Sequence, residues 1–350
     1  MTTSPQLEQR LAEIRGDSPR RSPTVRVLAA HSQHTDCKLA ALGFAAGIDF
    51  DHLLDKTRFA APFGQSPFAF ARGLAFEKRL RDNDYAATFD LLRSLRGFPR
   101  TGGRWVNLRQ GYKGPDRMRL RGQDTEALLG RIIRGDPQAL HLIDGAVLTA
   151  RIGGVQAYFE ADALAALTGQ EIRVAEVKSF PKVDERVDPD KLGAALDQVA
   201  IYIFLLRAVV PRLGGDPERH VSDRALLITP RNVSMTPTLS EQRVTARVGR
   251  AGKLLDSIPR AADVAASVPA SLSFVPVADK SANEARRLDA LHDLADRVGT
   301  CYTPNCLSTC GNARFCRERA IRDGSPSVAG RAALRLLPGI PTLGRRATAL

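Results

Sequence analysis

Two acidic residues and a lysine near the middle of the chain have the types and spacing that phosphodiester chemistry needs. Asp162 ends the run AYFEAD, and Glu176 and Lys178 lie in VAEVKS, with Glu176 fourteen residues after Asp162. Residues i and i+2 of a strand point to one face, so Glu176 and Lys178 share a face, and Asp162 joins them if the two strands are neighbours. Converging carboxylates suit Mg²⁺ or Mn²⁺, which could activate a water molecule, while the lysine stabilises charge developing on a phosphate.

A polar pair follows on the next expected helix. Gln198 and Tyr202 are at i and i+4 in the otherwise apolar stretch LDQVAIYIFLL, so they stack on one helix face. A buried glutamine needs partners, and a substrate phosphate or the Lys178 amine would serve. The alternative is a side chain satisfied by the backbone, just as an acidic-x-Lys pair alone is common on solvated strands.

The cysteines indicate a second site. Four of the five crowd into CYTPNCLSTCGNARFC, residues 301–316, and the fifth is Cys37. The first 30 residues contain no apolar signal core. We therefore expect a cytoplasmic protein with a four-ligand metal site instead of disulfides. Structural zinc is the competing interpretation, with His31 or His34 as an additional ligand, but zinc sites usually contain a tight C-x2-C pair, which is missing here.

The charge indicates a polyanionic partner. Lys and Arg number 51 and Asp and Glu 38, a net charge of +13, and the pI is about 10.0. Residues 104–134 hold eight Lys or Arg and three acids, with aromatic residues among them, as single-stranded nucleic acid binding requires. A solvated loop anchored by its tryptophan is the alternative. The predicted nucleic-acid contacts are Arg104, Trp105, Arg109, Tyr112 and Lys113.

Helices and strands must both be present to position these residues. Hydrophobic spacing predicts helices between Cys37 and Leu95, then short strands over residues 139–180, with Gly153-Gly154 as a hairpin turn. A helix is predicted to start at Asp188-Pro189 and to be buried, not membrane-spanning. RALLITP and RVTARV predict strands, and ANEARRLDALHDLADRV predicts a helix. The expected fold is therefore α/β, a mixed sheet flanked by helices.

In this order, EAD, AEVKS and QVAIY resemble the PD-(D/E)xK nuclease superfamily in its RecB-like branch. Gly73 and Glu77 in GLAFEKRL match that branch's Gly-x3-Glu motif, whereas Ala161 replaces the proline often found before the aspartate. The resemblance implies a restriction-endonuclease-like core. It also implies Mg²⁺ or Mn²⁺ ligands from Asp162, Glu176, the Val177 carbonyl and Glu77, a catalytic Lys178, and Gln198 and Tyr202 as orienting residues. Glu160 is a possible neighbour of the ligands, and Asp144 is expected in a turn.

The cysteine order resembles AddB-type proteins and CRISPR-associated RecB-like exonucleases, in which one cysteine before the nuclease core and three after it hold a [4Fe–4S] cluster. The matching residues are Cys37, Cys306, Cys310 and Cys316, with Cys301 as the alternative ligand. The x3 spacing between the first two of the trio departs from the usual x2. The resemblance implies an iron–sulfur subdomain formed by both ends of the chain.

The expected organisation is a flexible tail (1–23), a nuclease domain (24–322) with a basic insertion at about 100–138, and a basic C-terminal tail (323–350). The implied function is a metal-dependent deoxyribonuclease, an exonuclease preferring single-stranded DNA or DNA ends, in repair, recombination or defence. Its partners would be DNA and other repair or defence proteins, with no membrane. The alternatives are a catalytically weak or inactive DNA-binding or scaffold protein in a larger complex, and an enzyme acting on RNA.

Overall fold

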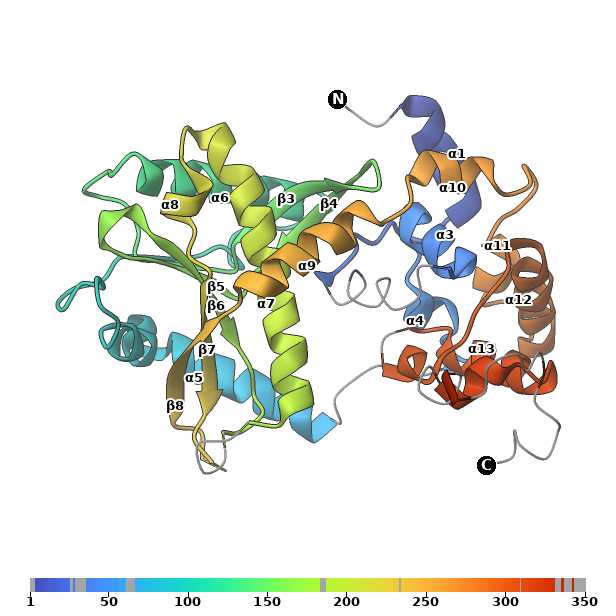
Figure 1. Cartoon of the computed structure of the whole chain (residues 1–350). Coiled ribbons are helices and arrows are strands. Elements are labelled where there is room, and N and C mark those ends of the chain that lie inside the picture. Colours follow the sequence, from blue (N-terminus) through green and yellow to red (C-terminus); the bar gives the residue numbers. More distant parts are fainter. Residues whose placement is uncertain are drawn as a thin grey trace. The chain divides into compact units, whose positions relative to one another are not determined.

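The computed structural model describes residues 4–25, 28, 36–60, 67–182, 187–232, 234–308, 310–330, 335–336 and 342. The chain divides into two compact units, both drawn in Figure 1. Unit 1 consists of Met1–Phe63, Arg151–Ala157 and Leu254–Leu350, and unit 2 of Gly64–Ala150 and Tyr158–Lys253. His31, His34 and most of the predicted C-terminal tail lie outside the described residues.

Unit 2 is built on a mixed six-stranded sheet with the strand order β1-β2-β5-β6-β7-β8. The pairs β1–β2 and β6–β7 are parallel and the other neighbouring pairs are antiparallel. The strands are β1 (Trp105–Asn107), β2 (Leu142–Asp144), β5 (Ala163–Ala166), β6 (Ile172–Val177), β7 (Arg224–Pro230) and β8 (Pro237–Arg243). The prediction of an α/β fold with a mixed sheet flanked by helices is confirmed.

A separate two-stranded hairpin joins β3 (Val147–Ile152) to β4 (Val155–Glu160). Its turn is Gly153-Gly154, as the sequence predicts. Both glycines have positive φ, 57° and 81°, which the tight turn of a two-residue hairpin requires.

Two long helices cover the sheet of unit 2. They are α5 (Pro67–Leu92) and α7 (Pro189–Val209), and α7 is extended by the 3₁₀ turn η2 (Val210–Leu213). α7 begins where predicted, because the Asp188 carboxylate accepts a hydrogen bond from the Lys191 amide at 3.1 Å. It is long and apolar enough to cross a membrane by composition, but it packs on β6 with Val199, Ile203 and Leu206 fully buried. The other helical elements are η1 (Thr168–Gln170), α6 (Arg117–Ile133), α8 (Pro217–His220) and α9 (Thr245–Asp256).

Successive side chains along β6 point alternately toward the α5 face and the α7 face of the sheet. Ala175 and Val177 pack in the apolar clusters that include side chains of α5. Glu176 and Lys178 point to the other face, where Lys178 contacts α7. The end of β6 is therefore lined on one face by α5 and on the other by α7 (Figure 1).

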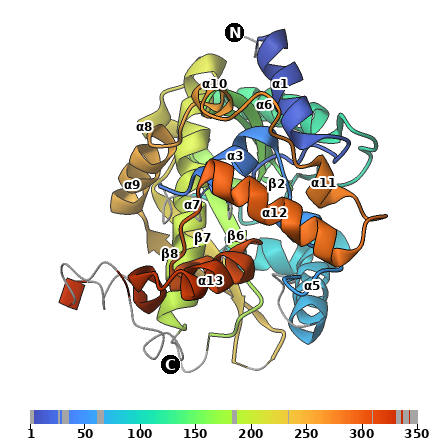
Figure 2. The same cartoon turned by 90° about the vertical axis from the view of Figure 1, so that its right-hand side faces the viewer.

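Unit 1 is helical and takes its elements from both ends of the chain. In its core α3 contacts α1, α10 and α12 (Figures 1 and 2). Leu11, Leu42, Leu291 and Phe315 are buried there together. The helices are α1 (Pro5–Arg15), α3 (Lys38–Ala46), α4 (Phe50–Leu53), α10 (Ala261–Ala266), α11 (Val275–Ala278), α12 (Glu284–Val298) and α13 (Ala313–Arg322), with 3₁₀ turns η3 (Pro304–Ser308) and η4 (Pro326–Ala329).

Three local expectations differ from the structure. Residues 5–15, expected in a flexible tail, form α1, because Leu11 and Ile14 lie on one helix face and are buried. RVTARV is not a strand, since β8 ends at its first residue, Arg243, and α9 begins at Thr245. Val244, just before α9, and Val248 within it form a buried i, i+4 pair. Residues 100–138 do not form a separate insertion, because they supply the edge strand β1 and the helix α6.

Candidate active site

The paired strands β5 and β6 bring together the two carboxylates singled out in the sequence. Asp162 lies in a bend just before β5, and Ala163 pairs with Ala175 in the antiparallel register. The Val177 amide donates a hydrogen bond to Asp162 Oδ2 at 2.9 Å, which fixes the carboxylate beside the end of β6. Glu176 is fully buried, and Lys178 Nζ lies 2.5 Å from its Oε1.

With both carboxylates ionised, the site would hold more negative charge than its lysine balances. Burial, with the neighbouring Asp162 charge, raises the pKa of Glu176 to about 8, and burial also raises the pKa of Asp162. Burial lowers the pKa of Lys178, but the two carboxylates outweigh it and raise that pKa, so Lys178 remains a cation. Apart from the ion pair, the Glu176 oxygens accept no hydrogen bond from the part of the chain that the structure describes. A buried carboxylate beside a half-buried one is suited to a further cation.

The polar pair on α7 holds the lysine. Lys178 Nζ donates to Gln198 Oε1 at 3.1 Å, and Gln198 Nε2 donates to Tyr202 Oη at the same distance. This series of hydrogen bonds ends at the main chain, where the Tyr202 hydroxyl donates to the Glu160 carbonyl at 2.6 Å. Burial raises the pKa of Tyr202, so its hydroxyl remains a donor. Of the alternatives open for Gln198, the structure shows the contact with the Lys178 amine.

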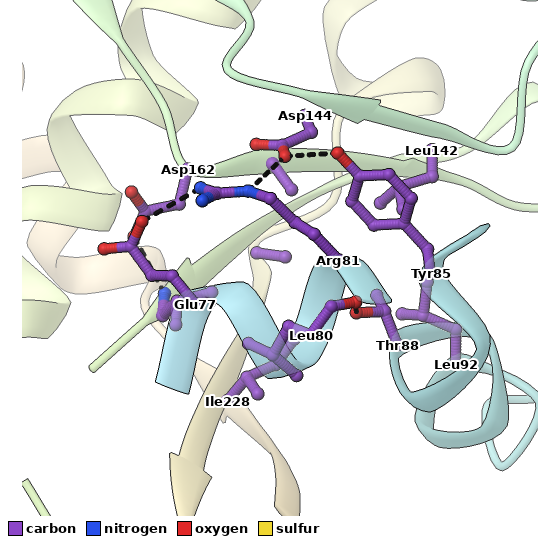
Figure 3. A pocket seen from close by; sticks show the side chains of 13 residues that line it. Glu77, Leu80, Arg81, Tyr85, Thr88, Leu92, Leu142, Asp144, Asp162 and Ile228 are labelled. Atoms are coloured by element: carbon purple, nitrogen blue, oxygen red, sulfur yellow. Dashed lines mark hydrogen bonds and ion pairs between the residues drawn. The ribbon is translucent and has the colours of Figure 1, made fainter. Parts of the chain in front are cut away.

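A small pocket on the α5 face of the sheet extends the site (Figure 3). Arg81 bridges two carboxylates: its Nη2 is 2.9 Å from Glu77 Oε2 and its Nε is 2.7 Å from Asp144 Oδ2. The Tyr85 hydroxyl donates to the same Asp144 oxygen at 2.5 Å. The pocket also borders Asp162, and its volume of about 30 Å³ is room for one or two water molecules. The predicted ligand Glu77 is therefore on the same pocket as Asp162.

Arg109 joins this pocket to Asp162. Its guanidinium makes an ion pair with Asp144, lies 2.6 Å from Glu160 Oε1 and 3.5 Å from Asp162 Oδ1. The nearly buried Arg121 adds a second contact to Glu160 at 2.7 Å. Burial opposes ionisation of Glu160, but the two arginines prevail and lower its pKa. Glu160 is thus already neutralised by arginines.

Asp144 was expected in a turn, but it is the last residue of β2 with only 4% of its side chain exposed. Its place follows from the sheet, since Asn107 of β1 pairs with Asp144 and Arg109 follows β1 directly. Sequence reasoning missed Arg81 and Tyr85 as well. The signal for Arg81 was readable, because Glu77 and Arg81 have the i, i+4 spacing of one helix face, whereas Tyr85 follows a break in the helix.

An unusual turn positions Tyr85. Asn83, Asp84 and Tyr85 have φ values of 52°, 54° and 62°, in the left-handed region that a bulky residue rarely adopts. The turn breaks α5 after Asp82 and buries the Tyr85 ring, whose centroid is 4.7 Å from that of Trp105. Backbone strain of this kind persists where the surrounding contacts fix it and is found at functional sites.

Most residues predicted to contact nucleic acid have internal partners. Arg104 donates to two main-chain carbonyls at 2.5 and 3.0 Å, Trp105 packs on Tyr85, and Tyr112 donates to a nearby carboxylate. Arg109 belongs to the site itself, which leaves Lys113 exposed on the surface. Their role in binding nucleic acid stays a prediction.

All five cysteines lie in or against the core of unit 1, and none of them forms a disulfide. Cys37, Cys306 and Cys316 are buried, and Cys301 and Cys310 are half-buried. A hydrogen bond from the Cys301 thiol lowers the pKa of Cys37 to about 6, despite burial, whereas burial raises that of Cys310 to about 12. Chain ends that are far apart in the sequence thus supply neighbouring thiols.

Neither site is arranged as a finished metal centre. Within the described ranges, no group of three or more His, Cys, Asp or Glu side chains is positioned to hold a metal ion. The chemistry of the donors nevertheless fits the expected groups: the buried Glu176 carboxylate with unused acceptor capacity beside Asp162 for Mg²⁺ or Mn²⁺, and neighbouring thiols for an iron–sulfur cluster.

No family model matches the chain, and a search of curated proteins found no match.

Proposed function

We propose that the chain is a metal-dependent deoxyribonuclease with the restriction-endonuclease-like core of the RecB-like branch. One observation carries the proposal. The pairing of β5 with β6 places Asp162 beside the buried Glu176, and Lys178 is held against Glu176 by a side-chain relay from α7. Two carboxylates, a fixed lysine and a glutamine–tyrosine pair are the groups that metal-assisted phosphodiester hydrolysis uses.

Each side chain has a distinct task in this proposal. Asp162, Glu176 and the Val177 carbonyl would hold Mg²⁺ or Mn²⁺, with Glu77 as a further ligand. The bound ion would supply Lewis-acid stabilisation of the phosphate and a lowered pKa for a water molecule. Lys178 donates to the phosphate oxygen on which charge develops, and Gln198 fixes the direction of its ammonium group. Tyr202 anchors Gln198 to the main chain.

The proposal extends to unit 1. Cys37, Cys306, Cys310 and Cys316 would hold a [4Fe–4S] cluster, with Cys301 as the alternative ligand and structural zinc as the alternative group. The cluster would cross-link the two ends of the chain. The gathering of the five cysteines in and against one core supports this part of the proposal.

The first test uses protein purified without oxygen and end-labelled single- and double-stranded DNA with Mg²⁺ or Mn²⁺. We expect the parent protein to shorten single strands from their ends. Asp162→Asn should lower the rate at least about a hundredfold, because metal-ion charge stabilisation is worth several kcal/mol. The matched control is Asp90→Asn, an exposed aspartate of the same unit, which should cleave normally. Equal cleavage by Asp162→Asn and the parent would show that the active site is elsewhere.

A second candidate function is a DNA-binding or scaffold protein that does not cleave. It is favoured by the finding that no group of the described side chains is positioned to hold a metal ion. Binding of DNA that survives Asp162→Asn, with no cleavage by the cluster-loaded parent, would support it. Competition between DNA and RNA oligonucleotides in the same assay separates an enzyme that acts on RNA.

A further inference from the structure

Arginines occupy the surroundings of Asp162 in which a divalent cation would have to bind. Arg109 contacts three carboxylates, Asp144, Glu160 and Asp162. Arg81 links Asp144 to Glu77, the expected ligand on α5 (Figure 3). The carboxylates that should converge on a metal are therefore turned toward guanidinium groups. This explains physically why they are not arranged as a metal site.

The charges of this network are close to balance without any metal. Its five carboxylates are Glu77, Asp144, Glu160, Asp162 and Glu176, and its four cations are Arg81, Arg109, Arg121 and Lys178. With all five carboxylates ionised, the formal sum is 4 − 5 = −1, and a divalent ion would make it −1 + 2 = +1. The added positive charge repels the guanidinium group that pairs with an Asp162 oxygen, so a bound ion must displace that cation from Asp162.

Arg109 is the cation that can be displaced with the smallest rearrangement. Its contact with Asp162 is the longest of its ion pairs at 3.5 Å, whereas it is held firmly by Glu160 at 2.6 Å and by Asp144. Asp144 is itself fixed by Arg81 and by the Tyr85 hydroxyl. If Arg109 leaves Asp162, these two carboxylates still compensate its charge.

We propose that Arg109 competes with the divalent ion for Asp162, and that Asp144 is the anchor that retains Arg109 when the ion binds. Arg109 and Asp144 are positioning residues that set the affinity of the site for the ion. The inference rests on the proposed metal site at Asp162. The two residues have opposite effects. Loss of the Arg109 charge removes the competitor, whereas loss of the Asp144 charge leaves Arg109 and Arg81 to pair more strongly with Asp162 and Glu77.

The experiment measures Mn²⁺ affinity by titration calorimetry on metal-free protein, without DNA. Arg109→Gln should bind Mn²⁺ at least about fivefold more tightly than the parent, and Asp144→Asn at least about fivefold more weakly, the lower end of typical couplings between sites. Arg109→Lys, which keeps the charge but not the fork of donors, should stay within about twofold of the parent, below the lower end of such couplings. The matched control Arg131→Gln, which removes an ion pair to Asp136 elsewhere in unit 2, should leave the affinity unchanged.

A weaker Mn²⁺ affinity in Arg109→Gln would overturn the proposal, because it would mean that Arg109 only orients Asp162. An unchanged affinity in both charge-removing variants would overturn it as well, as would absence of Mn²⁺ binding in every variant. Circular dichroism and urea unfolding check that the variants are folded, and Asp144→Asn tests the sign if Arg109→Gln does not fold. Cleavage is measured separately. If the Mn²⁺ affinities shift as expected but no variant cleaves DNA, the competition stands and the nuclease function is refuted. If the parent cleaves DNA but the affinities do not shift, the nuclease function stands and the competition is refuted.

Discussion

Glu176 shows how burial and neighbouring charges decide the state of one residue. It is fully buried, Asp162 adds negative charge, and among the described residues Lys178 alone pairs with it closely. Its pKa of about 8 means that, without metal, the folded protein holds a proton there at neutral pH. The unfolded chain releases the same proton near the ordinary value of 4.5. Stability and pH are therefore linked through this carboxyl group.

Glu176→Gln should remove that linkage. Between pH 4.5 and about 8 the folded parent binds one proton more than the unfolded chain, so its stability falls as pH rises through this window and then levels off. The 3.5-unit difference, 8 − 4.5, sets an upper bound of about 5 kcal/mol on the loss at about 1.36 kcal/mol per unit.

The measurement is the urea midpoint of both proteins in EDTA from pH 5 to pH 9. The glutamine variant should gain on the parent steadily as pH rises to about 8, since only the parent carries the titrating group. Parallel curves would show that Glu176 is ionised in the folded, metal-free protein.

The residues of the site differ in how well the sequence predicts them. Asp162, Glu176 and Lys178 follow from strand periodicity, because each lies within a few residues of one strand pair. Arg109 and Asp144 do not, since they meet only through the pairing of β1 with β2, which are separated by the whole of α6. Arg109 was assigned to nucleic acid binding from its type and neighbours, which carry no information about its partners.

At the scale of elements, α5 presents Glu77 through a helix that contains Gly73. The resemblance draws attention to this glycine, but the structure gives it no special backbone role. A Cβ added at Gly73 would lie 3.7 Å from Ser179 Oγ, an ordinary contact. At Gly103, in contrast, the added Cβ would lie 2.6 Å from the Phe89 ring.

Gly73→Ala should therefore stabilise unit 2 by about 0.5–1 kcal/mol, the usual gain when alanine replaces glycine within a helix. Gly103→Ala should destabilise it by about 1–3 kcal/mol through overpacking. Urea midpoints of the two variants and the parent check both values, and Mn²⁺ affinity is measured alongside. If Gly73→Ala folds well but binds Mn²⁺ poorly, the glycine is needed for close approach to the site.

Elements with one strong periodicity were predicted best. β6, α7 and α12 have clear patterns and clear ends, such as the Asp188 cap. The pattern of RVTARV fits both periods, because Val244 and Val248 are four residues apart as well as an even number apart, and tertiary packing selected the helix α9. The turn after Asp82 has no glycine or proline. Asn83 and Asp84 tolerate the left-handed region, but a left-handed Tyr85 could not be foreseen.

At the scale of the whole molecule, the sequence predicts that both chain ends belong together. A site shared by Cys37 and the cysteines of residues 301–316 requires that the two ends of the chain meet. Unit 1 is assembled from both ends, as this requires. The boundary of unit 2 was not predictable, because unit 1 also takes Arg151–Ala157, the tip of the β3–β4 hairpin. Contacts distant in sequence decide that assignment.

The cysteines give the last prediction. Serine replacement of Cys37, Cys306, Cys310 or Cys316 should abolish bound iron and acid-labile sulfide, whereas Cys301→Ser should keep both. Because the cluster would close a loop of more than 260 residues, the iron-loaded protein should unfold at higher urea than those four variants. By the relation for a disulfide that closes a loop of this length, the cross-link would add about 5–6 kcal/mol to the free energy of unfolding. Metal analysis and urea midpoints of anaerobically purified protein decide the matter. Loss of iron in Cys301→Ser with retention in Cys306→Ser would mean that Cys301 is the ligand in place of Cys306. Zinc in place of iron would refute the iron–sulfur cluster.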